Sequence, residues 1–169
     1  MSDKRLFFAL WPDDRQRERL RDTMAPLARQ VEGRAVPRGN WHVTLVFVGN
    51  QPEERVAPIM RAAAQVSMEE VRVRFDKLVF WQRPEIACLQ AMSVPAALEN
   101  CVISLREALE PFGLEPELGS YKPHITAVRA ARSFEPLTLA RPLELSFSEF
   151  VLVESVSDRG DVRYYPLKQ

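Results

Sequence analysis

The chain has 169 residues, of which 46% are hydrophobic and 27% charged, values that indicate a single globular domain over residues 1–169. Its 23 basic residues balance its 23 acidic residues, and the zero net charge excludes a protein that coats nucleic acid through a large positive excess. With two cysteines, no apolar run long enough to span a membrane and no signal-like segment before Pro12, we expect a cytoplasmic protein without a disulfide framework or a membrane partner.

The predicted elements begin with a buried strand at 5–10, followed by a helix that starts at Pro12 and carries aspartates in its first turn. Apolar residues then recur at helical spacing as far as Val31. Further strands are predicted at 41–48, 71–75, 86–91 and 123–129, an antiparallel pair at 143–153 and 162–167, and helices beginning at Pro52 and Pro95.

These seven strands and three helices follow the order β-α-β-α-β-β-α-β-β-β. Neighbouring strands joined by hairpins favour an α+β fold with antiparallel sheets. Each half of the chain contains a helix followed by a strand with the pattern His-x-Thr, which indicates an internal duplication.

The two histidines of the chain occur in the same local pattern. His42 is followed two residues later by Thr44, and His124 by Thr126, although the chain contains only four threonines. Random order would give this coincidence about once in 2,300 sequences, well below the usual false-positive rate of a short motif. Because residues i and i+2 of a strand point to the same face, each imidazole shares a face with a hydroxyl group.

Two such pairs around one small anion suit the cleavage of a phosphodiester. One histidine activates the attacking group as a base, and the other protonates the leaving oxygen as an acid, because an imidazole can serve in either role near neutral pH. The threonine hydroxyls are positioned to bind the non-bridging oxygens. Two histidines are too few ligands for zinc, and no carboxylate lies close to either motif, so we expect neither a metal nor another cofactor.

The segments around both motifs carry basic residues and no acid. Residues 33–52 contain Arg34 and Arg38, and residues 119–133 contain Lys122, Arg129 and Arg132. A locally positive surface in a neutral protein favours an anionic substrate.

With these motifs, the sequence resembles the 2H phosphoesterase superfamily, and within it the bacterial RNA 2′,3′-cyclic phosphodiesterases, also called 2′-5′ RNA ligases. The resemblance extends over nearly the whole chain. It rests on the segments RLFFALWPDD, NWHVTLVFVGN and YKPHITAVR, and on the Arg-Tyr-x-x-Leu pattern near the end of the chain.

The resemblance implies a two-lobed fold in which two antiparallel sheets face each other across a central groove, with the helices outside. It also implies metal-independent hydrolysis of a 2′,3′-cyclic phosphate to a 2′-phosphomonoester, with His42 as proton donor and His124 as proton acceptor. The two roles swap in the reverse, ligating reaction. The expected partners are RNA ends or nucleotides that carry the cyclic phosphate, and the protein is expected to be a monomer without an obligate protein partner.

Three further residues are candidates for substrate binding. Relatives often carry an arginine five residues after the second histidine, where Arg129 stands, but strand alternation points Arg129 away from His124 unless a bulge intervenes. Phe7 and Trp81 are candidates for stacking on a base, although core packing is the alternative for Phe7.

Two other functions remain open at this stage. One is a related enzyme that acts on another cyclic phosphodiester or on a 2′-5′ linkage. The other is a non-catalytic module that binds RNA ends. Turnover of a 2′,3′-cyclic nucleotide separates the enzymes from the binding module.

Overall fold

The computed structural model describes residues 3–117 and 119–167. The strands are β1 (Asp3–Leu10), β2 (Arg34–Ala35), β3 (Val43–Pro52), β4 (Val71–Trp81), β5 (Ile86–Ala91), β6 (His124–Arg129), β7 (Leu137–Phe147), β8 (Val151–Asp158) and β9 (Asp161–Leu167). The α-helices are α1 (Asp14–Ala28), α2 (Val56–Ala63) and α3 (Ala96–Ala108). None of the helices in the described part of the chain is both long and apolar enough to cross a membrane.

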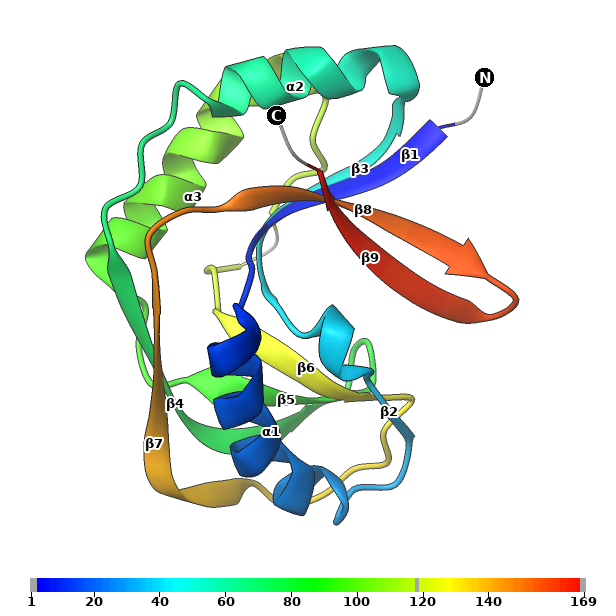
Figure 1. Ribbon diagram of the computed structural model, residues 1–169, viewed down its shortest axis with the longest axis vertical. Helices are drawn as coiled ribbons and strands as arrows, with labels where there is room; N and C mark the ends of the chain where they lie inside the picture. The colour runs from blue at the N-terminus through cyan, green and yellow to red at the C-terminus, as the bar shows by residue number, and fades with distance from the viewer. Residues whose placement is uncertain (1–2, 118, 168–169) are drawn as a thin grey trace.

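The strands form two sheets in which every neighbouring pair is antiparallel. One sheet has the order β3-β1-β8-β9, and the other has the order β2-β6-β5-β4-β7. Figure 1 shows the two sheets as separate lobes, with α2 and α3 beside the first and α1 against the second. The predicted α+β fold with two antiparallel sheets is therefore confirmed.

The predicted strand at 143–153 is wrong as a single element. Residues up to Phe147 belong to β7, which pairs with β4, whereas Val151 opens β8, which pairs with β1 and β9 in the other sheet. The chain changes sheet between Phe147 and Val151, where it contains neither glycine nor proline. Apolar alternation continues on both sides of this bend, so no sequence signal marks it.

Other element boundaries also differ from the prediction. The strand predicted at 71–75 continues as β4 to Trp81, past a register shift between Phe75 and Lys77. The two-residue strand β2 was not predicted, because a segment of this length has no measurable periodicity.

Helix α1 begins where its sequence predicts. The Asp13 side chain accepts a hydrogen bond from the Gln16 backbone, and the Gln16 side chain accepts one from the Asp13 backbone, which completes a capping box. The helix ends at Ala28, two residues beyond Pro26, and does not continue to Val31. Its buried positions, Arg17, Leu20 and Met24, face the five-stranded sheet through contacts with β6 and β7.

Candidate active site

Each His-x-Thr motif opens a strand of a different sheet. His42 precedes β3, an edge strand of the four-stranded sheet, and His124 begins β6 in the five-stranded sheet. The two strands contact each other where the lobes meet. Thr44 and His124 line one cavity of about 410 Å³ together with Trp81, and we call it the Trp81 cavity.

Both motif strands carry a one-residue bulge directly after the threonine. The register of β3 against β1 skips Leu45, and the register of β6 against β5 skips Ala127. A bulge of one residue reverses the alternation of side chains, so two successive residues are buried at each site. The recurrence of this irregularity at matching positions supports the internal duplication.

His42 is held in a defined orientation by its own segment. Its Nδ1–H donates to the carbonyl of Asn40 at 2.8 Å, because a carbonyl oxygen can only accept. The opposite ring nitrogen, Nε2, is then the accepting nitrogen of the neutral ring and lies 2.8 Å from the Thr44 hydroxyl. The imidazole therefore presents Nε2, the atom that can exchange a proton with a substrate, beside the threonine of its own motif.

His124 repeats the Nδ1 contact. Its Nδ1–H donates to the carbonyl of Lys122 at 2.9 Å, again two residues upstream. The Trp81 ring lies 4.2 Å from the imidazole, measured between ring centres. Thr126 follows on the same face of β6, on the near side of the bulge. In each motif Nε2 is thus the ring nitrogen that can exchange a proton, and in the free protein that of His42 is hydrogen-bonded to Thr44.

The electrostatics of the site favour neutral histidines in the free protein. The pKa of His42 is lowered to about 4, mainly by burial and also by the positive charges of His124, Arg129 and Arg17, against the hydrogen bond to Asn40, which raises it. Burial also lowers the pKa of His124, against the hydrogen bond to Lys122. A positive charge on His124 disfavours protonation of His42, so at most one of the two imidazoles is expected to be positively charged.

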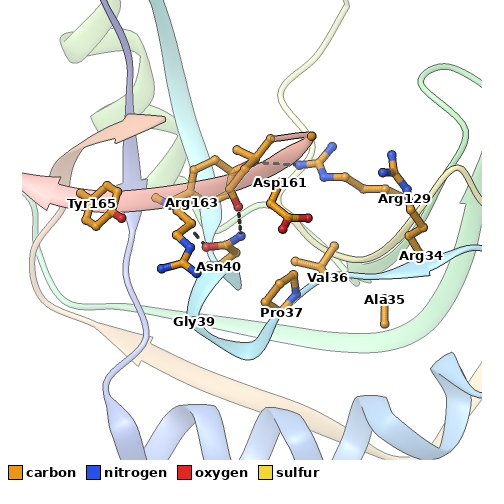
Figure 2. A pocket seen from close by; sticks show the side chains of 13 residues that line it. Arg34, Ala35, Val36, Pro37, Gly39, Asn40, Arg129, Asp161, Arg163 and Tyr165 are labelled. Carbon is orange, nitrogen blue, oxygen red and sulfur yellow. Dashed lines mark hydrogen bonds between the residues drawn. The ribbon is translucent and has the colours of Figure 1, made fainter. Parts of the chain in front are cut away.

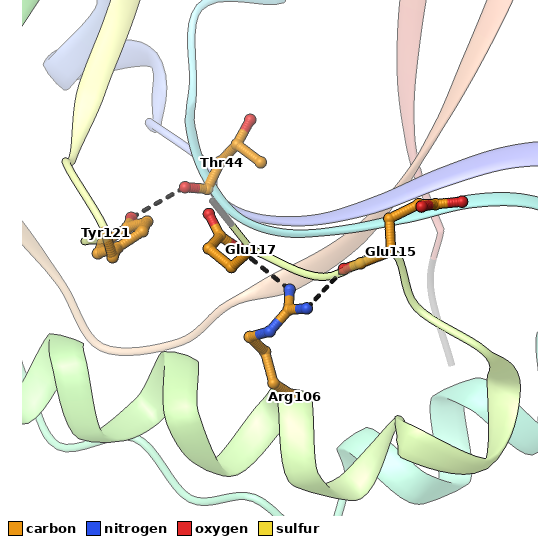
Figure 3. A network of polar contacts seen from close by, with 5 residues as sticks. All are labelled: Thr44, Arg106, Glu115, Glu117 and Tyr121. Atoms are coloured by element: carbon orange, nitrogen blue, oxygen red, sulfur yellow. Dashed lines mark hydrogen bonds and ion pairs between the residues drawn. The ribbon is translucent and has the colours of Figure 1, made fainter. Parts of the chain in front are cut away.

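A hydrogen bond holds the segment before the second motif against the first motif. The hydroxyl of Tyr121 donates to the Thr44 carbonyl at 2.9 Å (Figure 3). The segment that carries Tyr121 is itself tied to α3, because Arg106 donates to the Glu115 carbonyl at 2.7 Å and pairs with the Glu117 carboxylate at 3.0 Å. Burial raises the pKa of Tyr121, so its hydroxyl keeps the proton that this hydrogen bond uses.

Arg129 reaches the site because of the bulge at Ala127. With the alternation reversed, Arg129 is exposed on the face of His124 and Thr126. Its Nη2 donates to the Tyr164 hydroxyl at 2.9 Å, and the Tyr164 ring lies edge-on to the His42 ring at 5.1 Å. This arginine therefore connects the strand of the second motif to the surroundings of the first.

The two aromatic candidates have different environments. Phe7 is only 3% exposed and its ring packs 4.8 Å from the His42 ring, which favours core packing, the alternative given for Phe7, over stacking on a base. Trp81 is half-buried and lines the Trp81 cavity. Phe47, which was not predicted, is 64% exposed in the same cavity and follows His42 by five residues, as Arg129 follows His124.

Arg17 also lies near the first motif and was not predicted as a site residue. This arginine occupies a position of the buried face of α1 where an apolar residue is expected, and that substitution was the available signal. Its Nη1 donates to the carbonyls of Arg38 at 2.6 Å and Trp41 at 3.0 Å, the segment that leads into His42. Arg17 therefore fixes the backbone of the segment that precedes His42.

No three His, Cys, Asp or Glu side chains gather as metal ligands would within residues 3–117 and 119–167. Cys88 and Cys101 are both buried, and burial raises their pKa to about 12 and about 11. Neither thiol is therefore available as a thiolate nucleophile near neutral pH.

Comparison with known proteins gives concordant matches. The family model described as "LigT like Phosphoesterase" matches residues 10–87, which include the first motif. An RNA 2′,3′-cyclic phosphodiesterase of Escherichia coli (strain K12) is 28% identical over 169 residues, covering 98% of this chain and 95% of the relative. A protein of the same name from Archaeoglobus fulgidus is 27% identical over 130 residues, covering 76% of this chain and 73% of the relative.

Solved structures agree with the sequence matches. The crystal structure of E. coli LigT complexed with 3′-AMP superposes with a TM-score of 0.85 at 26% identity, covering 98% of this chain and 96% of the other. A structure described as a phosphoesterase gives a TM-score of 0.86 at 26% identity, with the same coverage.

Two antiparallel sheets each contribute a His-x-Thr strand to one cavity, which is the arrangement that the resemblance to the 2H phosphoesterases implies. The family model, the relatives and the solved structures all point to the same group of proteins, the LigT-like phosphoesterases. The chain is therefore similar to the LigT-like phosphoesterases in sequence and in fold.

Proposed function

We propose that the protein hydrolyses 2′,3′-cyclic phosphates on RNA ends or nucleotides and leaves a 2′-phosphomonoester. The observation that carries this proposal is the matched orientation of the two histidines. Each Nδ1–H is bound to a carbonyl two residues upstream, which leaves Nε2 as the ring nitrogen for proton transfer, and Thr44 of the first motif and His124 of the second line one cavity. The names of the relatives, RNA 2′,3′-cyclic phosphodiesterase, support the same reaction.

The proposed step needs one proton on the histidine pair. The neutral Nε2 of His124 accepts a proton from the attacking water as its oxygen bonds to phosphorus. The bond from phosphorus to the 3′ oxygen breaks, and the protonated Nε2 of His42 donates its proton to that oxygen. Thr44 and Thr126 donate hydrogen bonds to the non-bridging oxygens, where negative charge increases in the transition state. Arg129 adds a positive charge on the same face.

This reaction uses only protein groups, so we propose that it proceeds without a metal. We also keep the monomeric state and the cytoplasmic location expected from the sequence as parts of the proposal. We propose RNA ends, and not other cyclic phosphodiesters, as the substrate, because the relatives are named RNA 2′,3′-cyclic phosphodiesterase.

The activity is tested by incubating the protein with adenosine 2′,3′-cyclic phosphate in the presence of EDTA. We expect complete conversion to adenosine 2′-phosphate, identified by chromatography or phosphorus NMR, because the acid stands beside the 3′ oxygen. A 3′-phosphate product would reverse the roles of His42 and His124. Activity that is lost in EDTA and restored by zinc or manganese would contradict the metal-independent mechanism.

The lowered pKa values predict an unusual pH dependence. In the free protein, burial lowers the pKa of both His42 and His124 below the ordinary histidine value of about 6.5. The histidine pair therefore loses the proton that the reaction needs when the pH rises above this lowered pKa. We therefore expect kcat/KM, which reports the free protein, to decline with rising pH already below about pH 6.5. The bound anionic phosphate favours the protonated pair, so the alkaline limb of kcat should lie at higher pH.

Steady-state rates over the pH range from about 4 to 9 check this prediction, and the two apparent pKa values belong to the pair of histidines together. Coincident alkaline limbs for kcat and kcat/KM would contradict it, because the substrate would then have no effect on the proton held by the pair.

A further inference from the structure

A second cavity lies beside the first motif, because Tyr164, whose ring lies 5.1 Å from the His42 ring, lines it. It has a volume of about 580 Å³ and is lined by the segment before His42 and by the beginning of β9 (Figure 2). Three arginines, Arg34, Arg129 and Arg163, line it together with a single acid, Asp161. We call it the Arg34 cavity.

The arginines of this cavity are not neutralised by the protein. None of the three forms an ion pair with a carboxylate within residues 3–117 and 119–167, whereas the nearby Arg132 is paired with Glu32 at 3.2 Å. Arg34 and Arg163 are exposed, and Arg129 is bound to the neutral hydroxyl of Tyr164. The cavity therefore has an excess of positive charge in a protein of zero net charge.

Two of these charges are placed where they repel each other. Arg34 on β2 is the direct register partner of Arg129 on β6, so both side chains lie on the same face of the sheet. Figure 2 shows both side chains on the same side of their strands. Like charges directly opposite each other destabilise a sheet, and an anion between them relieves that repulsion.

Asn40 lines the cavity and also contacts the first motif. The Asn40 carbonyl accepts the hydrogen bond of His42, while its side-chain amide donates to the Val162 carbonyl on β9 at 2.7 Å. Arg129, on the strand of the second motif, and Tyr164, in contact with His42, both line the Arg34 cavity, so an anion bound there would lie close to both motifs.

We propose that the Arg34 cavity binds the phosphate on the 5′ side of the terminal ribose, the first phosphodiester of an RNA chain that ends in a 2′,3′-cyclic phosphate. This inference rests on the proposed function and names its substrate class as RNA strands in preference to free nucleosides. The terminal nucleoside occupies the Trp81 cavity, where Phe47 and Trp81 offer aromatic surface, and the chain leaves the site over Arg34 and Arg163. Arg129 lies between the two phosphates.

The test compares three substrates that share one terminal nucleoside: adenosine 2′,3′-cyclic phosphate, the same compound with a 5′-phosphate, and a short oligoadenylate ending in a 2′,3′-cyclic phosphate. The variants are Arg34→Gln and Arg163→Gln. The matched control is Arg141→Gln, an exposed arginine on β7 at the opposite edge of the same sheet.

For the two substrates with a 5′-side phosphate, we expect each variant to raise KM about threefold to tenfold with kcat nearly unchanged, the scale of one partly exposed charge contact. The KM of adenosine 2′,3′-cyclic phosphate should change by less than about twofold. The salt dependence of log KM for the oligoadenylate should become shallower by about 0.7 for each contact removed. Arg141→Gln should match the wild type throughout.

Thermal melting supplies an independent readout. Arg34→Gln removes one of two opposed charges, so its Tm should equal or exceed that of the wild type. A wild-type protein that shows no advantage for the 5′-phosphorylated substrates, or variants that raise KM equally for all three, would overturn the inference alone. A wild-type protein that turns over none of the three would contradict the proposed function.

Discussion

Replacing His42 or His124 with glutamine is expected to lower kcat for a 2′,3′-cyclic nucleotide by at least about 100-fold, the scale of a lost general acid or base. Glutamine keeps a polar side chain and fills much of the imidazole volume, but it exchanges no proton near neutral pH. The double variant should lose far less than the product of the two single losses, because acid and base act in one step. Single-turnover rates with the protein in excess measure both effects.

The same variants should keep the fold. His42 and His124 are only half-buried and stand where the two sheets meet, so the glutamine variants should melt within a few degrees of the wild type. Variants that unfold, or that remain within about tenfold of the wild-type rate, would contradict the catalytic assignment and favour a packing role for the histidines.

Replacing Leu105 with alanine is expected to give the opposite pattern. Leu105 is fully buried on α3, and its truncation should cost about 2–5 kcal/mol of the free energy of unfolding, through lost apolar burial and the cavity left behind. For a chain of this size that loss lowers Tm by roughly 2–4 °C for each kcal/mol. Urea denaturation with an unchanged m-value measures the change in stability.

The matched control for this variant is Ile103→Ala on the same helix. Ile103 is 49% exposed, so its truncation should change the unfolding free energy by no more than about 0.5 kcal/mol. The folded Leu105→Ala protein should retain the wild-type kcat. A stable Leu105→Ala variant with low activity, beside unstable histidine variants, would reverse the assignment of core and site.

The strands that carry the motifs were predictable because alternation with period two and a high content of β-branched residues leave little choice over 41–48 and 123–129. The bulges at Leu45 and Ala127 were not predictable, since neither residue differs from an ordinary strand residue. The position of Arg129 depends on the bulge at Ala127, so the sequence predicts only that Arg129 reaches the site if such a bulge is present.

Residues that act through distant contacts were beyond the reach of local patterns. Tyr121 bonds to Thr44 and Tyr164 contacts His42, and both pairings join segments far apart in the chain. Phe47 resembles a core residue in the sequence, because only the bulge turns it outward. The bend before Val151, which separates β7 from β8, has no local marker for the same reason: tertiary packing decides which sheet each half joins.

The order of the strands in the two sheets has a consequence for motion. Along the chain, β1, β3, β8 and β9 fall in one sheet and the intervening strands in the other, so the backbone crosses between the lobes four times within the described residues. In a two-lobed protein with a single connection, the lobes can move apart by bending at one hinge. Here any separation of the two lobes must bend several connections together. We therefore expect covalent connectivity as well as packing to limit changes in the separation of the two imidazoles.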